Sequence, residues 1–105
     1  AFNNAFSKVD KKTHITKLHP MTRKDNMKTF PKFKNLNEVP KFGITVGLKT
    51  ILLLSKSAIL VMTGKEKRVA FKKISSLKIF DKSWPASIIY SCKNNKIYVD
   101  KLVKK

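Results

Sequence analysis

The sequence has 105 residues, 42% of them apolar, so its composition excludes a disordered tail and allows one small domain with a core. Lys and Arg number 24 against 6 Asp and Glu, and the net charge of +18 favours nucleic acid, an anionic membrane surface or a phosphorylated ligand as partner. Lysines used as an ordinary solvated surface would give the same charge. Cys92 is the only cysteine, which excludes an intrachain disulfide, and we expect a cytoplasmic protein.

The first third of the chain predicts one weak strand and one helix. Residues 1–12 are polar and mixed and are expected to form a loop. Residues 13–18 alternate weakly between polar and apolar side chains, which is typical of a short strand. Pro20 suits the first turn of a helix, which should run to about Phe30 because Pro31 ends it.

The central segment carries the stronger patterns. After a loop at 32–40, residues 42–47 form an apolar strand closed by glycine, and 48–54 fit either a short helix or an extended run. Residues 57–62 are continuously apolar or β-branched, which is typical of a strand buried on both faces in a parallel sheet. Residues 65–77 predict an amphipathic helix. Its apolar face consists of Ala70, Phe71, Ile74 and Leu77.

The last part of the chain predicts a further helix and a final strand. Ser83 is a candidate cap for the helix, and Ile88 and Ile89 are its expected core face. Residues 96–100 form the last predicted strand, and the basic tail 101–105 is expected to fray.

Strands and helices alternate along the chain, which predicts an α/β fold with a mostly parallel sheet flanked by helices. The strands near 42–47, 57–62 and 96–100 should lie in one sheet, with the first two parallel.

The junction at Gly64 is the most informative local feature. A predicted buried strand ends there and a helix with lysines in its first turn follows. The free backbone amides of such a turn and the helix dipole favour an anion, and glycine allows its close approach. Lys67 adds a full positive charge, so this stretch predicts a phosphate site, although an ordinary strand–turn–helix with solvated lysines fits the same pattern. The glycine and lysine spacing is not that of a P-loop.

Other candidate sites have little support. His14 and His19 have no nearby carboxylate pair and Cys92 is distant in sequence, so neither a metal site nor a Cys–His nucleophile is expected. We expect no cofactor, and Trp84 is expected to be a core anchor. The longest apolar run is too short to span a bilayer and residues 1–12 lack the apolar core of a secretion signal, so no membrane partner is expected.

Several short motifs also follow one another in a familiar order. They are Ala1-Phe2-Asn3, 18–23 with Asn26, 39–47, 50–52, 59–64 with Lys67, 84–89 and 97–100. Their order and spacing resemble the C-terminal part of the glucosamine-6-phosphate deaminase (isomerase) family, so residues 1–105 would be a single C-terminal portion of such a domain. The resemblance implies a Rossmann-like α/β fold. Members of the family open an amino-sugar phosphate ring, move a proton between carbons 1 and 2, and release ammonia.

The resemblance also implies roles for individual residues. Lys67 would contact the substrate phosphate beside Gly64, and Lys28 would stand where the family has a second phosphate-binding arginine. Asn3 and Asn4 would be remnants of the active-site motif, with Asn4 in place of its glutamate. No catalytic residue of the family is retained, because the other acid and base residues would precede Ala1. The chain alone is therefore expected to be inactive.

The partners expected from this resemblance are a weakly bound sugar phosphate and the missing N-terminal half or other subunits. Two alternatives remain open. The chain could be a basic α/β module that binds nucleic acid or another polyanion through non-specific charge. It could also be a subunit that completes a sheet supplied by another chain, in which case an apolar sheet face should be exposed.

Overall fold

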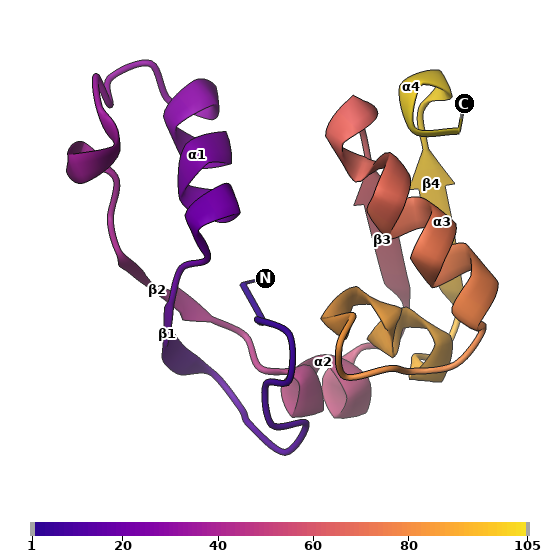
Figure 1. Ribbon diagram of the computed structural model, residues 1–105. Coiled ribbons are helices and arrows are strands. Elements are labelled where there is room, and N and C mark those ends of the chain that lie inside the picture. Colours follow the sequence, from indigo (N-terminus) through magenta and orange to yellow (C-terminus); the bar gives the residue numbers. More distant parts are fainter. Residues whose placement is uncertain (1, 105) are drawn as a thin grey trace.

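The computed structural model describes residues 2–104, so Ala1 of the predicted active-site remnant and Lys105 of the basic tail lie outside the described residues. In chain order the elements are β1 (His14–Lys17), α1 (Pro20–Thr29), the 3-10 segment η1 (Leu36–Glu38), β2 (Phe42–Thr45), α2 (Leu48–Leu54), β3 (Ala58–Met62), the 3-10 segment η2 (Lys65–Lys67), α3 (Arg68–Leu77), the 3-10 segment η3 (Pro85–Ser91), β4 (Asn95–Val99) and α4 (Lys101–Lys104). Figure 1 shows α1, β1 and β2 on one side, β3, β4, α3 and α4 on the other, and α2 at the base between them.

The strands form two small sheets among the described residues. β1 and β2 pair antiparallel, with Ile15 opposite Ile44, whereas β3 and β4 pair in parallel, with Leu60 opposite Ile97. The α/β class is confirmed, and so are strands at all the predicted places. The prediction of one sheet holding 42–47 beside 57–62 is wrong, because β2 takes β1 as its partner instead.

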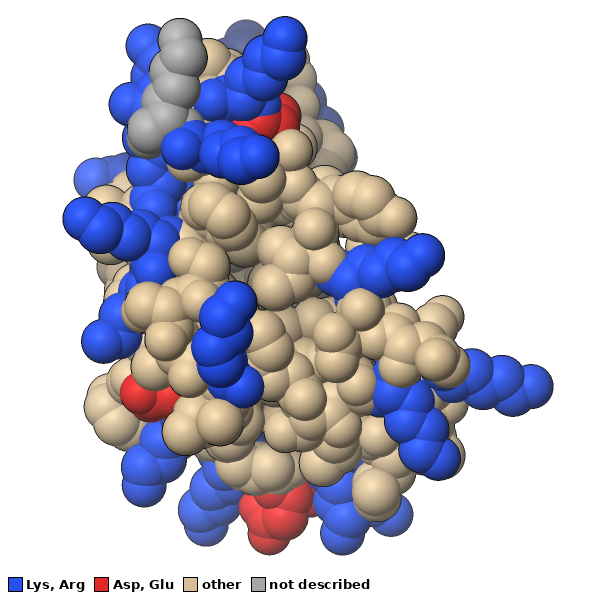
Figure 2. Space-filling model, turned by 90° about the vertical axis from the view of Figure 1, so that its right-hand side faces the viewer, with Lys and Arg blue, Asp and Glu red and all other residues tan. Residues whose placement is uncertain are grey.

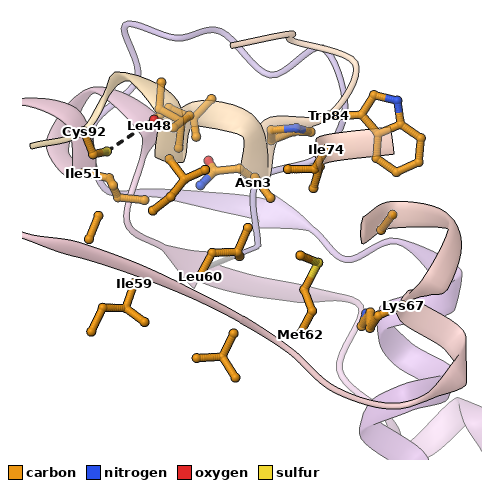
Figure 3. A pocket seen from close by; sticks show the side chains of 17 residues that line it. Asn3, Leu48, Ile51, Ile59, Leu60, Met62, Lys67, Ile74, Trp84 and Cys92 are labelled. Atoms are coloured by element: carbon orange, nitrogen blue, oxygen red, sulfur yellow. Dashed lines mark hydrogen bonds between the residues drawn. The ribbon is translucent and has the colours of Figure 1, made fainter. Parts of the chain in front are cut away.

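Strand β3 is covered on one face only, contrary to the prediction from its continuous apolar run. Met62 is buried, but Ile59 and Val61 are 60% and 63% exposed. Ile59 and Leu60 point to opposite sides of the strand (Figure 3), and it is Leu60 that packs against the core. A continuous apolar run means that both faces of a strand are suited to burial, but other elements must be present to cover them. Here the described elements cover only one face of β3.

The side of the molecule that holds β3, β4, α3 and α4, called the second side below, has its core between β3, α3 and α4. Met62, Ile74 and Val103 form its buried centre, and six partly buried residues pack around it: Leu60, Phe71, Trp84, Tyr90, Ile97 and Val99. Helix α3 presents the apolar face predicted from its spacing, although the first turn, η2, is a 3-10 segment. Trp84 is a core anchor, as predicted.

Helix α1 occupies the predicted place and begins at Pro20. The Nδ1 atom of His19 caps it by accepting a hydrogen bond from the Met21 amide at 3.1 Å. Residues 48–54, for which the sequence allowed two structures, form the helix α2. No helix within residues 2–104 combines the length and apolarity that crossing a membrane requires.

The predicted helix near Ser83 is a 3-10 segment, η3, that begins at Pro85. Ser83 does not cap it: its hydroxyl donates to Asp81 Oδ1 at 2.6 Å, and this bond together with the Ser83 amide lowers the pKa of the Asp81 carboxyl. Ile88 and Ile89 are buried as predicted.

The tail was expected to fray, but residues 101–104 form α4. Val103 is buried in the core, and its amide donates to Asp100 Oδ1 at 2.9 Å. The Arg68 Nε donates to the Leu102 carbonyl at 2.6 Å. The Asp100 bond is local to the start of α4, whereas the burial of Val103 and the Arg68 bond hold this segment against α3, which a basic composition alone does not indicate.

Candidate functional site

A cavity of about 470 Å³ lies beside strand β3, where α2, α3 and η3 approach it. Its wall is mostly apolar and includes Leu48, Ile51, Leu60, Met62, Ile74 and Trp84. Asn3 and Lys67 bring polar groups to the same cavity, and Figure 3 shows Lys67 at its edge beyond Met62. A concave, mostly apolar space with a few polar groups is the usual form of a small-molecule site.

Lys67 is the last residue of η2 and its side chain is 48% exposed. Its Nζ lies 4.0 Å from Oδ2 of Asp25, a residue of α1. The only ion pair among residues 2–104 therefore joins the two sides of the molecule at this lysine. Sequence reasoning missed Asp25, because its proximity to Lys67 depends on how α1 is placed.

Gly64 lies between β3 and η2, as expected, with φ of 89°. This left-handed region favours glycine, and a Cβ here would come within 2.6 Å of Glu66 Oε2. The Gly64 amide is not free for a ligand: it donates to Asp100 Oδ2 at 3.1 Å. The predicted set of free amides at this turn is therefore smaller than expected. A carboxylate of the chain itself accepts from the Gly64 amide, and the Lys67 amide donates to the Gly64 carbonyl at 3.1 Å.

The two asparagines of the predicted remnant face different surroundings. Asn3 lines the cavity, and its Nδ2 donates to the Val46 carbonyl at 3.0 Å, while its Oδ1 is buried without a hydrogen-bond partner among the described residues. Asn4 instead donates to the Lys17 carbonyl at 2.8 Å and to Thr16 Oγ1 at 3.3 Å. Asn4 therefore fastens the N-terminal segment to β1.

Lys28 lies in the last turn of α1 and is not among the residues that line the cavity. The structure thus brings Asn3 and Lys67 to one cavity, places Gly64 in the adjoining turn, and leaves Lys28 and Asn4 outside its wall. Asp25, three residues before Lys28 on the same helix, is the residue of α1 that reaches Lys67.

Cys92 also lines the cavity, but it is poorly suited to nucleophilic chemistry. The thiol is buried and donates to the Ile88 carbonyl at 3.3 Å. Burial raises its pKa, so the thiol stays protonated and unreactive at neutral pH.

Positive charge is spread widely over the surface. Figure 2 shows Lys and Arg side chains distributed around one face, with a broad uncharged area between them and few acidic groups. A dispersed distribution attracts polyanions in general and does not by itself define a site.

Comparison with known proteins identifies close relatives. No protein-family model matches the sequence. The glucosamine-6-phosphate deaminase of Malacoplasma penetrans is 35% identical over 97 residues, which cover 92% of this chain and 38% of that protein. The corresponding proteins of Shouchella clausii and of an Exiguobacterium species are 36% and 39% identical over 99 and 90 residues, covering 94% and 85% of this chain and 38% and 33% of theirs.

The fold agrees with these relatives. A solved monomeric glucosamine-6-phosphate deaminase, described as a missing link of the NagB superfamily, matches with a TM-score of 0.86 and 29% identity, over 98% of this chain and 41% of that one. The chain spans about two-fifths of the length of the proteins it matches. Within that span, sequence and fold agree, and the chain is related to one part of the glucosamine-6-phosphate deaminases.

Proposed function

We propose that this chain is a sugar-phosphate-binding portion of a glucosamine-6-phosphate deaminase-like protein. The observation that carries the proposal is the convergence of Lys67 and Asn3 on one cavity, in a chain whose relatives bear that enzyme's name. Lys67 would hold the phosphate at the cavity edge. The amino-sugar would lie toward Asn3, whose buried Oδ1 lacks a donor that a hydroxyl or amine could provide.

The form of the cavity supports this arrangement. Its volume of about 470 Å³ falls within the range of small-molecule sites, and its apolar wall lowers the local dielectric constant. Gly64 shapes the turn that carries Lys67. Lys28, on α1, does not line the cavity, so it would contribute a second positive charge rather than a direct contact.

The deaminase reaction, which combines isomerisation with hydrolytic release of ammonia, would belong to a larger assembly. Proton transfer between sugar carbons requires titratable groups at the reacting atoms. Asn3 carries an amide and cannot exchange protons in this way, and Asn4 is committed to the backbone of β1.

Exposed apolar strand faces support the presence of a further polypeptide segment. Ile15 and Ile44 are 71% and 72% exposed on the β1–β2 pair, and Ile59 and Val61 are exposed on β3. Parallel strands are normally buried on both faces, and a two-stranded sheet is rarely stable alone. A polypeptide segment such as the one that makes up the rest of the relatives, or another subunit, would cover these faces. The location proposed for the assembly is the cytoplasm, with which the single cysteine agrees.

Lys67→Ala should abolish localised phosphate binding. A charged hydrogen bond contributes about 1.5–3 kcal/mol, so a site built on one lysine should bind no tighter than about millimolar and should weaken at least tenfold on truncation. Titration with inorganic phosphate, followed by backbone amide chemical shifts, measures this. Lys101→Ala, at the start of α4, is the matched control and should bind as the wild type does.

Chemical-shift changes that are not localised in the same titration would contradict the proposed phosphate site at Lys67. If shifts are spread evenly over the lysines, or persist in Lys67→Ala, the second candidate function gains. That candidate is non-specific binding of nucleic acid, favoured by the net charge of +18, and its affinity should fall steeply with salt.

The isolated chain should release no ammonia from glucosamine 6-phosphate above background. The physical reason is that, among residues 2–104, the polar side chains at the cavity are the Asn3 amide and the half-exposed Lys67, and neither is a general acid or base positioned at a reacting carbon. A coupled ammonia assay, with a preparation from a host lacking its own deaminase, measures this. Turnover proportional to protein concentration would show that the chain carries catalytic groups of its own.

A further inference from the structure

In the Asp25–Lys67 contact, a carboxylate lies next to the ammonium group of the lysine that would bind phosphate. Asp25 belongs to α1, Lys67 to η2, and the two elements lie on opposite sides of the molecule (Figure 1). Their charged atoms are 4.0 Å apart, and the side chains remain 43% and 48% exposed. Both partners are therefore accessible to a dissolved anion that competes for the lysine.

The composition makes this contact unusual. The chain has 24 Lys and Arg residues but only 6 Asp and Glu, so most lysines have no acidic neighbour available. Within residues 2–104, Lys67 is the one lysine whose ammonium nitrogen lies within 4.0 Å of a carboxylate oxygen. Asp25 also stands among basic neighbours on α1, with Lys24 beside it and Lys28 one turn later.

We propose that Asp25 is an internal competitor for the anion site, occupying Lys67 when no phosphate is bound. This inference rests on the proposed function of Lys67. A phosphate that approaches Lys67 must displace the Asp25 carboxylate or bind beside it and meet its repulsion; either route lowers affinity. Asp25 thus lowers the affinity of the site without touching the ligand.

Asp25→Asn should raise the affinity of the Lys67 site for inorganic phosphate about two- to fivefold. The factor is modest because an exposed ion pair contributes little. The measurement is a phosphate titration at fixed ionic strength, followed by amide shifts of residues 64–68 in the full chain. Asp25→Glu keeps the carboxylate and should bind nearly as the wild type does.

Asp10→Asn is the matched control for net charge. Asp10 lies in the exposed segment before β1, so its neutralisation makes the same change in total charge without touching Lys67. It should leave the affinity within about 1.5-fold of wild type, because Asp10 is exposed, makes no ion pair with Lys67, and is screened by salt. Lys67→Ala and the double variant Asp25→Asn/Lys67→Ala should both lack localised binding.

The outcomes separate the two proposals. If the wild type binds locally, Lys67→Ala abolishes binding and Asp25→Asn has wild-type affinity, the competitor role is wrong and the phosphate site stands. An equal gain in Asp25→Asn and Asp10→Asn would also overturn the competitor role, because net charge would explain it. If neither the wild type nor Asp25→Asn shows localised shifts at residues 64–68, both proposals fail.

Discussion

Replacing Ile74 by alanine should lower the free energy of unfolding by about 2–5 kcal/mol, which is the cost of removing a large aliphatic side chain from a packed core. Ile74 is 2% exposed and stands at the centre of the cluster with Met62 and Val103. The loss would also leave a cavity between α3 and β3. A chain with exposed strand faces has little stability in reserve, so the folded population should fall sharply. Urea denaturation followed by far-UV circular dichroism measures the change.

Val69→Ala is the matched control on the same helix. Val69 is 73% exposed, so truncation should change the free energy of unfolding by less than about 0.5 kcal/mol. Similar losses in the two variants would contradict the assignment of the core to one face of α3.

Gly47→Ala should destabilise the protein by about 1–3 kcal/mol, through steric overlap with the backbone. Gly47 has a φ of −75°, which alanine adopts without strain, so conformation is not the cause. A Cβ at this position would overlap the carbonyl oxygens of Lys11 and Lys12. Relief requires the loop before β1 to move away from α2, which would break the 3.3 Å hydrogen bond from the Lys49 amide to the Lys11 carbonyl.

The two effects of Gly47→Ala can be measured together. Thermal denaturation gives the loss of stability, and amide exchange at Lys49 reports the broken hydrogen bond. Gly43→Ala is the control: its Cβ would meet Leu18 Cδ2 at 3.3 Å, the end of a side chain that can shift. Faster exchange at Lys49 in Gly43→Ala than in Gly47→Ala would contradict this account.

Local patterns predicted the elements whose formation depends on neighbouring residues. Pro20 and Pro31 bracket α1 because proline suits a first helical turn and cannot continue a helix. The spacing of Phe71 and Ile74 predicted the buried face of α3, because residues three apart lie on one side of a helix. The family resemblance was also readable at this level, from the order of short motifs, and the relatives and the fold bear it out.

The candidate site was readable only in part. The sequence predicted Gly64 at the turn after a strand, since glycine followed by polar residues ends an apolar run. It did not indicate that Asp100 would accept the Gly64 hydrogen bond, because 36 residues separate the pair. Asp25 and Lys67 are farther apart still along the chain. Which of the 24 basic residues meets a carboxylate depends on the packing of α1 against the second side, and on no local pattern.

The sequence by itself determined the α/β class, the places of the strands and of α1 and α3, and the family resemblance. Only the tertiary structure decided that β2 pairs with β1, that β3 is covered on one face, and that Val103 holds the tail in the core. The physical reason is that helix caps and apolar periodicity act within a few residues, whereas the partner of a strand and the cover of its face are set by segments far along the chain. The apolar run of β3 makes both of its faces suited to burial, and the surrounding elements determine which face is actually covered.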